Sequence, residues 1–123
     1  MRVLQTSPWL LLNLLATLVQ KAQILTLNAR ADMLQTSPWL LLEADLILLD
    51  TAHLGDWEQQ VYLHLCTHGY KGLLVLDDIH ANIQMELFWA GISHRKYDLT
   101  SVGHAVSGTG LVDFGGALRV LGL

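Results

Sequence analysis

Two short apolar runs constrain the fold of this chain more than any other feature. The segments DLILLD (45–50) and GLLVLD (72–77) are hydrophobic at nearly every position, and each ends in an aspartate. An apolar run without alternation is typical of a parallel strand that is covered on both faces. The segment GDWEQQVYLHLCTH, predicted as a helix at about 55–68, lies between the runs and would supply the crossover connection. The sequence therefore predicts an α/β fold with parallel strands.

Further elements are predicted on both sides of this unit. In chain order they are a helix at about 7–20, a strand at about 22–28, a short helix at about 36–42, a helix at about 81–94, strands at about 97–104 and 110–114, and a last apolar piece at 117–121. The turn-rich SGTG at 107–110 is expected to join the last two strands as an antiparallel hairpin. A phosphate-binding loop is the alternative, but no lysine follows SGTG and it opens no helix.

Charge and cysteine content narrow the classes of partner. Eleven acidic residues against seven Lys and Arg give a formal charge of −4, and no basic stripe exists to attract a phosphate backbone. We therefore expect no nucleic-acid partner. The single cysteine, Cys66, cannot form an internal disulfide, which favours a reducing compartment, the cytoplasm.

The N-terminal apolar run Trp9–Val19 raises the question of a membrane. It is shorter than the roughly 20 residues that span a bilayer. A signal peptide is the alternative, but Gln20 and Lys21 stand where a small-residue cleavage site would follow. A buried amphipathic helix is favoured, and no membrane partner is expected.

The segment LQTSPWLLL occurs twice, at Leu4–Leu12 and Leu34–Leu42. Repeat proteins need about three or more units to bury a continuous core, so a local duplication without a function of its own is favoured. In both copies Ser-Pro is a good helix start, because serine caps and proline takes the first helical position. We divide the chain into this duplicated part, 1–43, and the α/β part, 44–123.

Acidic residues follow both central strands. The carboxyl ends of parallel strands meet at one sheet edge, where ligands of open α/β sheets bind, so Asp50, Asp77 and Asp78 are expected to lie close together. Three such carboxylates repel one another unless a cation neutralises them. Oxygen ligands suit Mg²⁺ or Mn²⁺ better than zinc. The alternative is that one of them, Asp78, caps the following helix.

Two sets of histidines are also candidates. His53, in the loop after Asp50, could accept a proton from a substrate hydroxyl, although a lone loop histidine is more often only solvated. His64 and His68 are four residues apart on a predicted helix and could chelate zinc, with Cys66 on another face. The alternative is two ordinary residues near a helix C-terminus, where a cationic histidine is favoured.

From Asp45 to Phe114 the segments LILLDTAH, YKGLLVLDDIH and KYDLTSVGHAVSGTGLVDF carry a resemblance. The chain resembles the C-terminal half of a class I S-adenosylmethionine-dependent methyltransferase, with its Rossmann-like sheet. Among these it is most similar to the metal-dependent small-molecule O-methyltransferases of the catechol, caffeoyl-CoA and macrocin types. The resemblance implies that Asp50, Asp77 and Asp78 hold Mg²⁺ or Mn²⁺ and that His53 is the basic residue after the first ligand. It implies O-methyl transfer from S-adenosylmethionine to a small-molecule acceptor, with the last two strands as the closing hairpin.

The chain departs from this family in its first part. The family holds its cofactor on a Gly-rich turn after the first strand, whereas the first 54 residues here contain no glycine. AQILTLNARADM resembles the third strand at best. We therefore expect a truncated sheet, and whether the chain is an enzyme stays open. The alternatives are a non-enzymatic pseudo-enzyme fragment or oligomerisation module, and another metal-dependent enzyme such as a hydrolase.

Loss of the first strand would leave the strand at about 45–50 as an edge. An unpaired edge is a template for pairing with another chain, so we expect self-association unless the strand at about 22–28 covers it.

Overall fold

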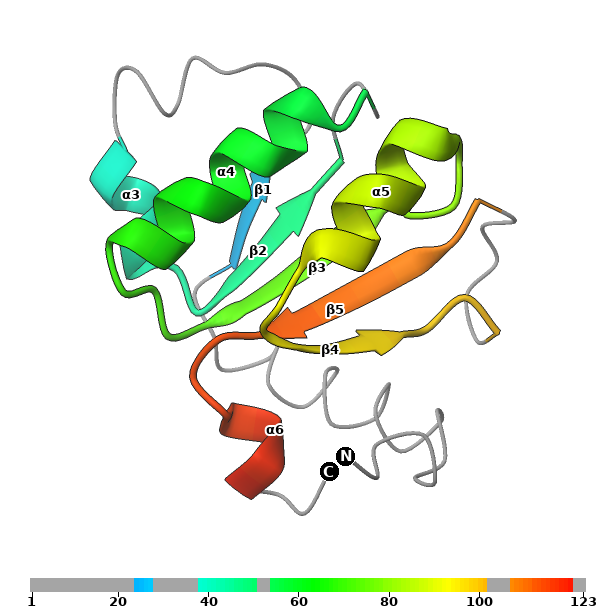
Figure 1. Cartoon of the computed structure of the whole chain (residues 1–123). Helices are drawn as coiled ribbons and strands as arrows, with labels where there is room; N and C mark the ends of the chain where they lie inside the picture. Colours follow the sequence, from blue (N-terminus) through cyan, green and yellow to red (C-terminus); the bar gives the residue numbers. More distant parts are fainter. Residues whose placement is uncertain (1–23, 28–37, 51–53, 102–106, 121–123) are drawn as a thin grey trace.

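The computed structural model describes residues 24–27, 38–50, 54–101 and 107–120 (Figure 1). The helix predicted at about 7–20 lies outside these residues. The described elements are β1 (Ile24–Leu27), α3 (Pro38–Glu43), β2 (Leu46–Leu49), α4 (Asp56–Thr67), β3 (Leu73–Asp77), α5 (Ile83–Gly91), β4 (Arg95–Asp98), β5 (Thr109–Asp113) and α6 (Ala117–Val120).

The strands form one open mixed sheet in the order β1-β2-β3-β5-β4. β1, β2 and β3 run parallel, while β5 is antiparallel to both β3 and β4. The α/β class, the parallel strands with crossover helices and the closing antiparallel pair are therefore confirmed. β4 begins and ends earlier than predicted, at Arg95 and Asp98.

The prediction that the strand at 45–50 forms an edge is wrong. β1 pairs with β2 in parallel, with Thr26 opposite Leu48, and β3 pairs with β2 on its other side. The alternative, in which the strand at about 22–28 covers it, is confirmed for Ile24–Leu27. The outermost strands among the described residues are thus β1 and β4. β4 has the sequence RKYD, and charged residues on an outer strand discourage pairing with another sheet.

α4 and α5 lie side by side on one face of the sheet (Figure 1). Side chains alternate between the faces of a strand. Ile47 and Leu49 of β2, with Leu74 and Leu76 of β3, therefore point to the same side and join the larger core cluster. The helices contribute apolar residues at helical spacing to this cluster, namely Val61, Tyr62, Leu65, Met85, Phe88 and Trp89.

The opposite face carries a smaller core cluster around Tyr97 and Leu111, to which α6 contributes Leu118. Leu48 and Val75 lie on this face and are only half-buried. The alternation that places them here continues to the residues two positions on, Asp50 and Asp77. The two aspartates therefore belong to the less covered face of the described sheet.

The helix starts follow the capping chemistry of their first residues. Pro38 takes the first position of α3, as predicted. The backbone N–H of Gly55, before α4, donates to Glu58 Oε1 at 2.9 Å. α5 begins after Asn82, whose Oδ1 accepts from the backbone N–H of Met85 at 2.9 Å.

Within the described residues, none of the helices has both the length and the apolar character that crossing a membrane requires.

Candidate metal centre

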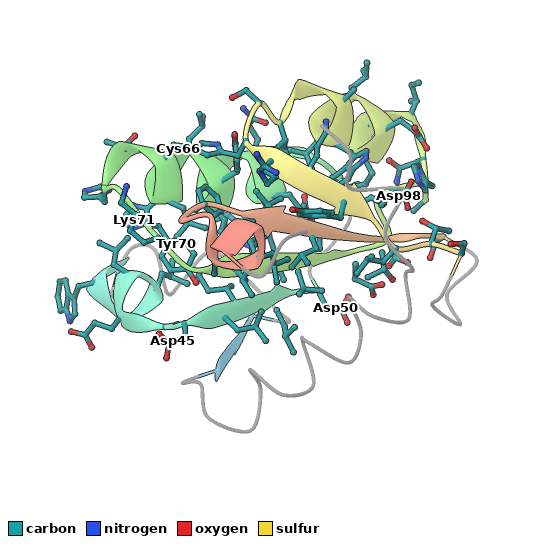
Figure 2. All side chains as sticks on the ribbon, turned by 90° about the horizontal axis from the view of Figure 1, so that it is seen from below. Asp45, Asp50, Cys66, Tyr70, Lys71 and Asp98 are labelled. Carbon is teal, nitrogen blue, oxygen red and sulfur yellow. The ribbon has the colours of Figure 1, made fainter. Side chains whose placement is uncertain are left out.

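Three carboxylates meet at the carboxyl end of the parallel strands. Leu49 pairs with Leu76, so the residues that follow them, Asp50 and Asp77, leave neighbouring strands side by side. Asp50, Asp77 and Asp78 each offer one oxygen, and these oxygens all lie within 4.8 Å of one another. The predicted proximity is confirmed, and we call these three residues the acidic corner. Figure 2 shows Asp50 at the tip of β2, with Asp45 at the opposite end of the strand.

The burial and the negative charges of the acidic corner alter the titration of Asp77. The pKa of Asp77 lies above its ordinary value, first because burial penalises the charged form. The neighbouring carboxylates of Asp78 and Asp50 raise it further, as does a hydrogen bond shared with Asp50, while the backbone N–H of Asp78 opposes the shift. The corner therefore resists carrying three full negative charges without a counter-ion.

Asp78 is held from several directions. Its backbone adopts a φ of +59°, in the left-handed region, and its N–H donates to Gly108 O at 2.8 Å and to Asp77 Oδ1 at 3.0 Å. The hydroxyl of Ser107 donates to Asp78 Oδ1. The alternative that Asp78 caps the following helix is wrong, because Asn82 caps α5. Ser107 and Gly108, directly before β5, instead hold Asp78 beside the other two acids.

An open depression of about 260 Å³ adjoins the acidic corner. Its lining combines carboxylates, a hydroxyl and apolar side chains, from Leu48, Leu49, Asp50, Val75, Asp77 and Thr109. A small molecule lying there would contact apolar side chains while its polar atoms faced the carboxylates.

The donor chemistry and spacing of the corner fit a hard divalent cation. Carboxylate oxygens are the ligands that Mg²⁺, Mn²⁺ and Ca²⁺ prefer. Two oxygens on opposite sides of Mg²⁺ are about 4.2 Å apart, twice the Mg–O bond of about 2.1 Å. The three oxygens lie within 4.8 Å of one another, which is close to that spacing.

Sequence reasoning missed a second polar cluster near the corner. The Nε2 of His80 donates to Asp98 Oδ2 at 2.7 Å, and its Nδ1 contacts Glu86 Oε1. The hydrogen bond with Asp98 is the main reason that the pKa of His80 lies above its ordinary value; burial opposes this shift, and Glu86 adds to it. Thr100 donates to Asp98 through both its hydroxyl and its backbone N–H. The only available signal was that His80 follows Asp78 by two residues.

His53, the predicted proton acceptor, lies outside the described residues. Its role therefore stays a prediction.

The residues do not fit S-adenosylmethionine in the way that the resemblance implies. β1 is the strand that pairs with β2 on the side away from β3. It is followed by NARADM, and the chain has no glycine before Gly55. A turn without glycine cannot bring its backbone as close to a ligand, because Cβ atoms intervene.

Comparisons with protein-family models, with curated proteins and with solved structures each found no match to this chain.

Proposed function

We propose that this chain is a divalent-cation-binding α/β domain related to the metal-dependent O-methyltransferases, with a truncated Rossmann-like sheet. The observation that supports it is the acidic corner, where three carboxylate oxygens lie within 4.8 Å at the end of parallel strands. The adjoining depression offers space for a small-molecule acceptor beside the carboxylates.

The proposed chemistry is assistance to a reaction at an acceptor hydroxyl. Bound Mg²⁺ or Mn²⁺ would lower the pKa of that hydroxyl and stabilise negative charge on its oxygen. Asp50, Asp77 and Asp78 hold the ion, and the apolar lining of the depression orients the acceptor. His53 accepts the hydroxyl proton in this proposal.

A second candidate is a non-enzymatic domain that binds the cation without using a methyl donor. The absence of glycine from the first 54 residues favours it, because the donor-binding turn of the family depends on glycine. Another metal-dependent reaction, such as hydrolysis, is the third reading of the same corner.

Titration calorimetry with MnCl₂ tests the cation site. We expect saturable binding to the wild-type chain and a large loss of affinity in Asp50→Asn, Asp77→Asn and Asp78→Asn. Glu43→Gln is the matched control, since it removes one negative charge from the exposed end of α3. Equal affinities in all five proteins would refute the cation site.

A second titration, with S-adenosylmethionine in saturating MnCl₂, separates the candidate functions. A saturable isotherm supports the methyltransferase reading. Cation binding without donor binding supports the non-enzymatic domain. Cation-dependent turnover of an ester or phosphoester that is indifferent to the donor would support the hydrolase.

We also propose that the chain self-associates through β1, the outermost described strand on the uncharged side of the sheet. Size-exclusion chromatography with light scattering should give a dimer at micromolar concentration. Substitution of Leu25, which lies in the middle of β1, by proline removes a backbone donor and should shift the protein towards monomer. A clean wild-type monomer would contradict this proposal.

A further inference from the structure

The C-terminal end of α4 brings two imidazole rings together, those of His64 in the last turn and of His68, the C-cap residue, far from the acidic corner. The ring centroids of His64 and His68 lie 4.4 Å apart, and the planes are tilted by 41°. Cys66, between them on α4, lies at the opposite end of the sheet from Asp50 in Figure 2. Whatever these histidines bind is therefore independent of the acidic corner.

The protonation state of one ring is determined by its hydrogen bond. His68 Nδ1 lies 3.0 Å from the backbone carbonyl oxygen of His64. A carbonyl oxygen only accepts, so Nδ1 carries the hydrogen and, in the neutral ring, the lone pair is on Nε2. Histidines that bind metals usually donate the other ring N–H to a carbonyl or carboxylate, which fixes the tautomer and the ring orientation. His68 has this arrangement.

The spacing of the rings suits a shared ion. Histidines at i and i+4 on a helix lie on one face, the arrangement that supplies two ligands in zinc-binding helices. With metal–nitrogen bonds of about 2.1 Å, the two ligating nitrogens are at most about 4.2 Å apart. Rings whose centroids are 4.4 Å apart can place one nitrogen each within that limit.

We propose that His64 and His68 form a two-histidine site for a transition-metal ion such as Ni²⁺, Cu²⁺ or Zn²⁺. Imidazole nitrogen suits these ions far better than Mg²⁺, whereas the carboxylates of the acidic corner also accept hard ions such as Mg²⁺ and Mn²⁺. The half-buried and exposed positions of His64 and His68 leave water to complete the coordination. The bound ion links His64, in the last turn of α4, to His68. Directly after His68 the chain turns at Gly69, whose φ is +68°.

Calorimetric titration with NiCl₂, in saturating MgCl₂ to fill the acidic corner, tests the site. We expect one ion per chain, and affinity lower by about 100-fold in both His64→Asn and His68→Asn, because two ligands on one helix act at high effective concentration. Asp77→Asn is the control and should bind Ni²⁺ as the wild type does. Unchanged affinity in either histidine variant, or loss of Ni²⁺ binding in Asp77→Asn, would overturn the proposal.

A measurement on the wild-type chain guards against variants that fail to fold. Substoichiometric paramagnetic Cu²⁺ should broaden the amide resonances of Cys66 to Gly69 before those of the acidic corner. Broadening centred on Asp77, or on His80 and Asp98, would place the ion elsewhere and contradict the two-histidine site.

Discussion

Replacement of Asp77 by asparagine should have opposite effects on the metal-free and the metal-bound protein. Asparagine keeps the shape and the acceptor for the backbone N–H of Asp78, which lies 3.0 Å from Asp77 Oδ1. It removes the negative charge between two other carboxylates. Without metal, the variant should therefore be more stable than the wild type, although it loses a ligand.

The size of the metal-free effect follows from the geometry. Two charges 4.8 Å apart repel by about 0.9 kcal/mol in water and about 3.5 kcal/mol at an effective dielectric of about 20. Asp50 is exposed and Asp77 half-buried, so the water-like limit applies. We expect about 1 kcal/mol of stabilisation, or a rise in Tm of about 3–5 °C for a domain of this size.

Thermal unfolding in EDTA and in saturating MgCl₂ measures both effects. An ion present at 100 times its Kd stabilises the wild type by about 2.7 kcal/mol, and the variant should lose most of this gain. The order of stabilities should therefore invert between the two conditions. Glu43→Gln, which removes a charge elsewhere, should leave the order unchanged. An Asp77→Asn protein that is less stable in EDTA, or gains as much from MgCl₂ as the wild type, would refute the reasoning.

The same variant has a pH signature. Folding raises the pKa of Asp77. Protonation of Asp77 therefore adds to the free energy of unfolding at low pH, and this addition is lost as pH rises through the folded-state pKa. In EDTA, the stability advantage of Asp77→Asn should thus be full at pH 7 and shrink as pH falls towards the ordinary aspartate pKa of about 4.

Three further predictions concern other parts of the structure. Folding raises the pKa of His80, chiefly through the hydrogen bond with Asp98. Protonated His80 therefore adds to the free energy of unfolding. This addition is full below about pH 6.5 and is lost as pH rises through the raised pKa. His80→Gln should remove that dependence from unfolding curves measured in EDTA between pH 5 and 9, and an unchanged profile would contradict it. A Cβ added at Gly115 would lie 2.1 Å from Lys71 O, so Gly115→Ala should cost about 1–3 kcal/mol. Gly91 ends α5 with open space around its Cα, so Gly91→Ala should stabilise by up to about 1 kcal/mol; denaturant unfolding of both variants checks the opposite signs.

The acidic corner was predictable because its causes are local in the sequence. Uninterrupted apolar runs identify strands buried on both faces, and parallel strands place their carboxyl ends at one edge. The observed register, with Leu49 opposite Leu76, brings the next residues together, as those two rules require. The strand boundaries also followed the apolar runs to within two residues for β2 and β3.

The contacts around the corner were not predictable, because they depend on where the antiparallel pair joins the sheet. A hairpin can add to β3 through either of its strands, and the sequence does not distinguish these orders. β5 joins β3, which pairs Asp77 with Thr109 and brings Ser107 to Asp78. The SGTG segment was interpreted only as a turn, so its hydroxyl was not counted as a partner of the acids.

The position of β1 is predicted from the sequence only as one of two alternatives. A strand of four residues, ILTL, has no feature that ties it to one neighbour. The resemblance to a third strand of the family does not place it, whereas the alternative that it covers the strand at about 45–50 agrees with its pairing to β2. The pairing of β1 with the buried strand β2 satisfies a row of backbone hydrogen bonds. This requirement outweighs a short sequence similarity.

The corner also explains why folding stability and cation affinity should oppose each other in this chain. Hydrogen bonds from Ser107 and from the backbone N–H of Asp78 offset part of the cost of gathering three acids, but burial, and after it the charges of Asp78 and Asp50, still raises the pKa of Asp77, so part of the repulsion remains. That remaining repulsion is relieved when a divalent cation binds, so it contributes to the affinity. Neutral substitutions at the three acids should therefore fall on one trend, in which each gain in metal-free stability accompanies a loss of affinity for Mn²⁺. Ser107→Ala should depart from this trend, because it removes a hydrogen bond to Asp78 without removing charge and should lower stability and affinity together.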